Sequence, residues 1–318
     1  MRPLLLTLDA FNTLFHPRHP IPTQYASSAS AFHIPVSASS LQPAFRASYK
    51  ALSASHPNYG RDLALRGEYA GPRQWWADVI RGSFARALAE SDSTVTEIPD
   101  ALIQDLLDRF ASARGYKLYD DVEPFFRELR ARELGGSIHG RRKVVVGVVS
   151  NSDDRISSVL ESLGVSIGDA RAGEMGSGWK LPGFEEEREK VIQSGSQRDV
   201  GTGSLQGKGQ EQGNDQRDVD FVLTSYQAGA EKPDRLVWDM ALREAQSLYT
   251  EAGNGDADAG GWECIHVGDD YGKDYRGAVE AGWKAYHLPR EAEAAAKTPE
   301  GTRTITSLLD LLPELGYK

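Results

Sequence analysis

The chain has 318 residues, a formal net charge of −10 and a hydrophobic composition of 40%. This length is enough for two packed lobes, and the single cysteine, Cys264, excludes an internal disulfide framework and suits a reducing compartment. The negative charge argues against nucleic acid and against anionic membranes as general partners.

Targeting and membrane segments are absent from the sequence pattern. No run of about 18 apolar residues occurs, which is the length that spans a bilayer. The apolar run at residues 4–8 is too short for the core of a signal peptide. We therefore expect a cytoplasmic or nuclear protein without a membrane partner.

The first predicted element is a buried strand at residues 4–8, because the run Leu-Leu-Leu-Thr-Leu is short and almost entirely apolar. It ends at Asp9. A turn-rich stretch containing two prolines follows at residues 16–20.

Residues 23–117 show helical periodicity throughout, and no alternation typical of strands interrupts them. Apolar residues four apart, from Trp76 to Leu88, form one stripe, and a second stripe runs from Leu102 to Phe110. Trp75 and Trp76 could stack on a substrate ring, but their spacing favours a place in the core of a helical lobe.

An unbroken β-branched run at residues 144–149 predicts a central parallel strand that ends at Ser150. Two further short apolar runs lie at residues 221–224 and 264–267, and each is followed by a helical pattern. Strands alternating with helices indicate an α/β fold with a Rossmann-like, doubly wound parallel sheet. We expect the sheet domain at residues 1–16 plus 119–318, with residues 17–118 inserted as an all-helical lobe.

Residues 169–218 are rich in Gly, Ser and Gln, a composition that cannot bury enough surface to order itself. We expect a flexible insertion there. A smaller insertion is predicted at residues 251–261.

Four polar residues fall at or just past the ends of predicted strands, where open parallel sheets form their sites. They are Asp9, Ser150, Lys232 and Asp269. Each alone has an ordinary explanation, as a helix cap, a turn residue or a solvated surface charge. Together, in this order along the chain, they predict a single site.

The chemistry of the set points to phosphoryl transfer. Asp9 and Asp269 would repel each other unless a hard cation lay between them, and Mg²⁺ prefers such oxygen ligands. Asp9 could then attack phosphorus, while Ser150 and Lys232 stabilise charge on the transferring group. Asp274 would act behind these residues by orienting water or Lys232.

The four segments resemble the motifs of the haloacid dehalogenase (HAD)-like hydrolase superfamily, and residues 17–118 resemble its helical C1 cap. The closer resemblance is to the group of the rhythmically expressed gene two protein. The segments that carry it are His56–Gly60, Arg73–Trp76, Ser150–Arg155, Asp220–Ser225 and His266–Asp274.

This resemblance implies a Mg²⁺-dependent phosphatase-type hydrolase acting on a small phosphorylated metabolite. It implies that the metal is held by Asp9, Asp269 and the main-chain carbonyl of Phe11, with Asp270 and Asp274 behind them. The residues implied to bind phosphate are Asn12, Thr13, Ser150, Asn151 and Lys232.

One residue departs from the phosphatase pattern of the superfamily. Phe11 stands where those enzymes have a second aspartate that moves protons, and loss of such a group typically costs about 10²–10⁴-fold in rate. Three interpretations stay open: a weak or narrow phosphatase, for which His16 is a possible but less favoured substitute acid; a non-catalytic binding protein that keeps the fold; and, less favoured, a 2-haloacid dehalogenase. Dehalogenases share an aromatic residue at this position but need no metal and lack the paired acids Asp269 and Asp270.

Overall fold

The structure is a computed structural model that describes residues 2–89, 97–135, 143–171, 217–253 and 261–315. Within them lies one six-stranded sheet, and every pairing in it is parallel. Its strands, in spatial order, are β5 (Ile167–Arg171), β6 (Val219–Thr224), β4 (Val144–Ser150), β1 (Leu4–Leu8), β7 (Glu263–Gly268) and β8 (Lys284–His287).

The first strand, β1, lies at the topological switch point of this sheet. It pairs with β4 on one side and with β7 on the other. The strands of this sheet that follow it in sequence, β4 to β6, are added on the first side, and β7 and β8 are added on the second. Sites in open α/β sheets form at such points, outside the carboxyl ends of the strands. The predicted Rossmann-like, doubly wound fold is therefore confirmed.

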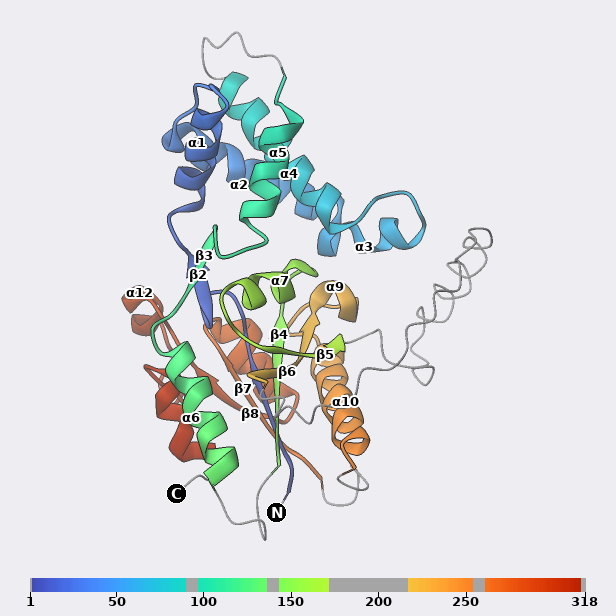
Figure 1. Cartoon of the computed structure of the whole chain (residues 1–318), viewed down its shortest axis with the longest axis vertical. Coiled ribbons are helices and arrows are strands. Elements are labelled where there is room, and N and C mark those ends of the chain that lie inside the picture. Colours follow the sequence, from blue (N-terminus) through green and yellow to red (C-terminus); the bar gives the residue numbers. More distant parts are fainter. Residues whose placement is uncertain (1, 90–96, 136–142, 172–216, 254–260, 316–318) are drawn as a thin grey trace, which may run out of the picture.

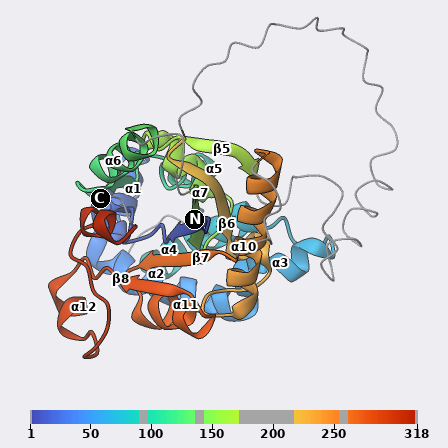
Figure 2. The same ribbon diagram turned by 90° about the horizontal axis from the view of Figure 1, so that it is seen from below.

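Helices cover both faces of the sheet (Figures 1 and 2). Side chains of β1 alternate between the two layers, so Leu4, Leu6 and Leu8 join one buried cluster and Leu5 joins the other. The first layer contains α6 (Val122–Gly135), α7 (Arg155–Ser162) and the 3₁₀ helix η2 (Leu308–Leu315). The second contains α10 (Arg235–Glu251) and α11 (Gly277–Glu280).

A group of helices stands beyond the carboxyl edge of the sheet, and we call it the helical region (Figure 1). It comprises α1 (Ile21–Ala31), α2 (Ala38–Ser55), α3 (Pro57–Leu65), α4 (Pro72–Ala89) and α5 (Asp100–Arg109). Both predicted apolar stripes lie on helices, with Phe84 of α4 and Leu106 of α5 fully buried. The chain enters and leaves this region through two short antiparallel strands, β2 (Phe15–Pro17) and β3 (Tyr116–Leu118).

Three details of the sequence prediction are wrong. Residues 16 and 17 belong to β2 and not to a turn. The stretch at residues 23–117, in which no strand was expected, contains the start of β3 at residue 116. Each of these strands has three residues, which are too few for a periodic pattern to show. Residues 169–171 belong to β5, so the predicted insertion begins too early. Most of that insertion, residues 172–216, lies outside the described residues, as do residues 254–260.

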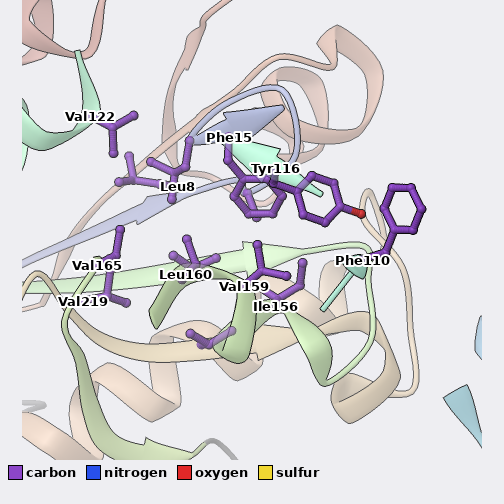
Figure 3. Packing of buried hydrophobic residues seen from close by; sticks show 14 of the residues in the cluster. Leu8, Phe15, Phe110, Tyr116, Val122, Ile156, Val159, Leu160, Val165 and Val219 are labelled. Atoms are coloured by element: carbon purple, nitrogen blue, oxygen red, sulfur yellow. The ribbon is translucent and has the colours of Figure 1, made fainter. Parts of the chain in front are cut away.

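The apolar core is continuous between the sheet and the helical region. Figure 3 shows Leu8 of β1 close to Phe15 and Tyr116, with Phe110 at the end of the row. These aromatic rings lie at the junction of β2, β3 and α5, with Phe15 and Tyr116 at 5.1 Å and Phe110 and Tyr116 at 5.8 Å between centroids. The helical region is thus anchored to the sheet by apolar packing at its base.

Among the helices of the described residues, none combines the length and the apolar character that a membrane span requires.

Candidate active site

Asp9 follows β1 directly and is only 6% exposed. Its amide donates to the carbonyl of Val267 on the neighbouring strand at 2.9 Å, which fixes the backbone at the edge of the sheet. Lys232 Nζ donates to Asp9 Oδ1 at 2.6 Å and to the Val149 carbonyl at 2.7 Å. Asp9 and Lys232, two of the four predicted site residues, are therefore in direct contact, although they are 223 positions apart.

The loop that carries Lys232 is held by Asn151. The amide of Lys232 donates to Asn151 Oδ1 at 2.6 Å, and Asn151 Nδ2 donates to the Lys232 carbonyl at 2.9 Å. The next residue, Pro233, approaches Gly277 so closely that a Cβ on Gly277 would lie 2.7 Å from the proline Cβ. Asn151 thus positions the backbone of Lys232, in addition to any contact that it makes with a ligand.

The acidic segment after β7 supplies a second carboxylate to Lys232. Asp274 Oδ1 lies 2.7 Å from Lys232 Nζ, and its Oδ2 accepts from the Asp270 amide at 3.0 Å. Gly268 permits this approach, because a Cβ there would lie 2.3 Å from the Asp274 carboxyl carbon. The side chain of Asp270 caps the π-helix η1 (Tyr271–Arg276) by accepting from the amides of Gly272 and Lys273.

The site holds more negative than positive charge. Burial and the carboxylates of Asp274 and Asp9 act in opposite directions on Lys232, and the carboxylates dominate and raise its pKa. Burial outweighs the attraction of Lys232 for Asp9, so the pKa of Asp9 is raised, whereas Lys232 and His266 overcome burial and lower the pKa of Asp274. One lysine, shared by two carboxylates, cannot fully stabilise both.

Asp269 adds a third carboxylate on the more exposed side. Burial, followed by repulsion from Asp274, raises its pKa to about 6. Oxygen atoms of Asp9, Asp269 and Asp274 all lie within 4.8 Å of one another. Such a cluster of hard oxygen ligands with a surplus of negative charge fits a divalent cation such as Mg²⁺. Both carboxylate oxygens of Asp274 already have partners, Lys232 at Oδ1 and the Asp270 amide at Oδ2. Asp9 contacts Lys232 through Oδ1, so Asp9 and Asp269 are better placed to be ligands.

The segment after Asp9 turns sharply. Asn12 has a left-handed φ of 55°, its side chain is exposed, and its amide donates to the Phe15 carbonyl at 2.8 Å. Thr13 is fully buried, and among the described residues its Oγ1 has no hydrogen-bond partner. An unpaired buried hydroxyl is costly unless a ligand or water completes it. Ser150, the last residue of β4, is 3% exposed and pairs with Thr224 of β6.

Phe11 lies against the base of the helical region. Its half-buried ring contacts Phe15 at 4.8 Å and Tyr116 at 5.5 Å between centroids, both edge to face. These contacts are a stable arrangement for aromatic rings. The side chain at this position therefore extends the apolar junction and offers no group that can transfer a proton.

His16 is part of the same junction. It lies on β2, half-buried, with its ring 4.6 Å from that of Tyr119 and Nδ1 at 3.0 Å from the Pro17 carbonyl. These contacts place His16 in the packing of the junction. Cys264 lies on β7, where burial raises the pKa of its thiol to about 12, which does not suit a nucleophile.

Sequence reasoning missed Thr7 and His266, which lie side by side in the register of β1 and β7. His266 Nε2 is 3.2 Å from Asp274 Oδ1, and its Nδ1 is 2.8 Å from Thr7 Oγ1. Burial lowers the pKa of His266, so the neutral ring donates from Nε2 to Asp274 and leaves Nδ1 as the acceptor towards Thr7. The Thr7 hydroxyl is closer to Nδ1, at 2.8 Å, than to its other acceptor, the Ile265 carbonyl, at 3.3 Å. The available signal was a polar residue within each apolar strand.

Comparisons with known proteins agree with this fold. No family model matches the chain. Haloacid dehalogenase-like hydrolase domain-containing protein 3 of Bos taurus is 29% identical over 98% of this chain and 94% of its own length. The protein of the same name from Xenopus tropicalis is 32% identical over 48% of this chain and 70% of its own length.

A solved structure of the same class shows the same fold. The 2-haloacid dehalogenase from Pseudomonas syringae pv. Tomato aligns over 98% of this chain and 97% of its own chain, with a TM-score of 0.51 and 17% identity. At this identity the likeness concerns the fold alone. The relatives define the class of the protein, haloacid dehalogenase-like hydrolases, and the neighbour shows that the fold is shared. The chain belongs to the haloacid dehalogenase-like hydrolase superfamily.

Proposed function

We propose that this protein is a Mg²⁺-dependent phosphatase of weak or narrow activity, with Asp9 as nucleophile and a small phosphorylated metabolite as substrate. The observation that carries the proposal is the contact of Lys232 with Asp9 at 2.6 Å inside a cluster of three carboxylates. A carboxylate nucleophile, a buried cation and a site for a divalent metal are the parts that phosphoryl transfer to an aspartate requires.

Asp9 and Asp269, with the main-chain carbonyl of Phe11, would hold the metal. Bound Mg²⁺ supplies positive charge that offsets the carboxylates and one phosphate oxygen. Lys232 occupies Asp9 Oδ1, which leaves Oδ2 as the attacking atom. Lys232 and Ser150 then stabilise charge on the phosphoryl oxygens, with Asn12, Thr13 and Asn151 around them.

In the first step, Asp9 Oδ2 attacks phosphorus and the bond between phosphorus and the leaving oxygen breaks. The leaving oxygen takes its proton from water, because Phe11 has none to give. In the second step, water attacks phosphorus, the aspartyl-phosphate bond breaks, and the proton of that water passes to solvent. Esters whose leaving oxygen is already a weak base are favoured substrates, since they depend least on a general acid.

Hydrolysis of p-nitrophenyl phosphate with Mg²⁺ and with EDTA tests the proposal. We expect slow, Mg²⁺-dependent turnover in the wild type and none in Asp9→Asn. Phe11→Asp restores the missing proton donor and should raise kcat by about 10²–10⁴-fold. Beryllofluoride with Mg²⁺ should raise the unfolding temperature of the wild type but not of Asp9→Asn. Turnover that is unaffected in Asp9→Asn would contradict the nucleophile assignment.

A non-catalytic binding protein that retains the fold is the second candidate. The observation that favours it is the placement of Phe11 in the junction with Phe15 and Tyr116, because the phenyl ring of Phe11 has no proton to give to a leaving oxygen. It predicts that the wild type binds Mg²⁺ and phosphate without turnover, while Phe11→Asp gains activity. A 2-haloacid dehalogenase is less favoured, because the carboxylate cluster suits a metal that such chemistry does not need. Release of halide from 2-chloropropionate tests it directly.

A further inference from the structure

The most unusual backbone of the described chain lies at the start of α3. Asn58, Tyr59 and Gly60 follow one another with φ of 45°, 60° and 73°, all in the left-handed region. Asparagine tolerates this conformation, but a tyrosine there is an outlier. Such strain persists only where the surrounding contacts determine it, and it gathers at functional positions.

The contacts of this segment run to the sheet domain. Asn58 Nδ2 donates to the Ser225 carbonyl at 2.7 Å, and the Ser225 hydroxyl donates back to Asn58 Oδ1 at 3.1 Å. Tyr59 Oη donates to the Asn151 carbonyl at 3.3 Å, and Arg61 Nε donates to the Tyr226 carbonyl at 2.7 Å. The left-handed turn and the residue after it thus contact the segments that directly follow β4 and β6, the second of which is the short helix α9 (Ser225–Ala228).

A second contact from α4 reaches the same loop after β4. Trp76 Nε1 donates to Asp153 Oδ2 at 2.7 Å, and the guanidinium of Arg155 lies 4.3 Å from the centre of a Trp76 ring. Tyr59 lies beside this group, with its ring 5.2 Å from Trp75 and 6.2 Å from Trp76 between centroids. The segments His56–Gly60 and Arg73–Trp76 of the helical region therefore meet the sheet domain at one place.

A short chain of hydrogen bonds connects this contact region to Asp9, the proposed nucleophile. Tyr59 contacts the carbonyl of Asn151, the side chain of Asn151 holds both backbone groups of Lys232, and Lys232 Nζ contacts Asp9. The hydroxyl of Ser225, which bonds to Asn58, also lies 3.2 Å from the Ser152 carbonyl and shares its single proton between these two acceptors. A shift of the helical region would loosen these loops and, through them, Lys232.

We propose that the left-handed turn Asn58–Gly60 is a positioning element of the site: its contacts with Ser225 and Asn151 hold the helical region against the sheet domain and so keep Lys232 directed at Asp9. Asn58 and Tyr59 are positioning residues, since they act through Asn151 and Lys232 and do not touch the reacting atoms. The functional part of this inference rests on the proposed phosphatase activity, and the structural part does not.

The test is Asn58→Gly, with His33→Gly as the matched control. Both residues have positive φ, so glycine relieves backbone strain at either position. Asn58 loses two hydrogen bonds to Ser225. His33 follows the C-cap of α1 with an exposed side chain, and in the described chain no hydrogen bond from that side chain reaches the sheet domain. The comparison therefore separates loss of the contact from relief of strain.

Two measurements follow. Loss of two hydrogen bonds should lower kcat for p-nitrophenyl phosphate about tenfold in Asn58→Gly with little change in KM, and leave it unchanged in His33→Gly. Amide hydrogen exchange in residues 150–154 and 224–233 should become about tenfold faster in Asn58→Gly only, with α6 unaffected. Tyr59→Phe removes one hydroxyl and should produce a smaller effect of the same kind, about threefold.

The outcomes are separable. Should the wild type hydrolyse no phosphate ester, the proposed function fails, and hydrogen exchange alone decides whether the turn holds the loops. Equal exchange in Asn58→Gly, His33→Gly and wild type overturns the inference, whatever the activity. Faster exchange in Asn58→Gly with unchanged kcat also overturns it, because the turn would then be structural only.

Discussion

The edge of the sheet and the helical region are stabilised by different kinds of contact. At the sheet edge, buried charges hold one another: Lys232 is bound by Asp9 and Asp274, and Asp274 is bound in turn by His266. In the helical region, apolar and aromatic side chains such as Phe84 and Trp75 fill the interior. The first arrangement fixes directions between atoms, whereas the second fixes only shape and volume. The sheet edge is thus suited to chemistry and the helical region to covering it.

The largest effect is expected from Lys232→Met, which removes the single cation shared by two buried carboxylates. Breaking such a cluster leaves uncompensated charge and should lower the free energy of unfolding by about 3–5 kcal/mol. Activity towards p-nitrophenyl phosphate should disappear. Urea unfolding in EDTA and a turnover assay measure both.

Lys284→Met is the control for this substitution. Lys284 pairs with Glu314 at 3.1 Å, but the two side chains are 31% and 49% exposed. Exposed pairs contribute about 0–1 kcal/mol, so this variant should be close to wild type. Equal losses in the two variants would show that the buried cluster is not special.

Phe84→Ala tests the helical region alone. Phe84 is fully buried on α4 and stacks with Tyr25 at 6.0 Å between centroids. The cavity should lower the free energy of unfolding by about 3 kcal/mol, while kcat of the folded protein for a small ester stays at the wild-type level. Leu65→Ala, at an exposed position of the same region, should cost less than about 0.5 kcal/mol. A large fall in kcat of Phe84→Ala, measured where the variant is fully folded, would mean that packing in this region also directs the catalytic groups.

The same difference explains what could be predicted from sequence. Asp9, Ser150 and Asp269 lie at or just past strand ends, as predicted, because unbroken apolar runs such as residues 144–149 mark buried strands, and parallel strands end at one edge. That convergence follows from topology alone. The prediction was wrong for Lys232, which lies farther on, beyond the short helix α9 (Ser225–Ala228) that follows β6. Strands such as β8, with the mixed sequence Lys-Ala-Tyr-His, and the three-residue β2 and β3 give no periodic signal and were missed.

Contacts between the helical region and the sheet domain could not be predicted. Asn58 and Ser225 are 167 positions apart, and a single asparagine does not reveal which distant carbonyl it will meet. The left-handed backbone at Tyr59 is likewise hidden, because tyrosine gives no preference for it. Thr7 and His266 were missed since the neutral ring and the hydroxyl gain their roles only from strand register.

The surplus negative charge at the sheet edge predicts a dependence on pH. The pKa of Asp269 is raised to about 6 from 3.8, so its contribution to stability is fully present below about pH 4 and is lost as pH rises through about 6. This amounts to up to about 3 kcal/mol, at 1.36 kcal/mol per unit. The protein in EDTA should therefore unfold at lower temperature at pH 8 than at pH 5.

Magnesium should reverse this trend, because a cation binds the deprotonated carboxylates. The increase in unfolding temperature on adding Mg²⁺ should be larger at pH 8 than at pH 5.5, and Asp269→Asn should reduce both the pH trend and the Mg²⁺ effect. A Mg²⁺ effect that is the same at both pH values would argue against protons and the metal competing for this cluster.

The smallest expected effect comes from Thr7→Val, which keeps the shape of the side chain and removes its hydroxyl. Without the Thr7 donor, Nδ1 of His266 loses its partner, at a cost of about 1 kcal/mol. The neutral ring can then carry its proton on Nδ1, which turns an acceptor towards Asp274 and weakens the support of Lys232. Nitrogen-15 spectra of His266 should show a mixture of tautomers, and kcat should fall by about fivefold. Thr306→Val, at an exposed threonine bonded to Asp310, should change neither. A ring that keeps its Nε2 proton in Thr7→Val would mean that Asp274 alone fixes the tautomer, and the directional network at the sheet edge would then end at His266.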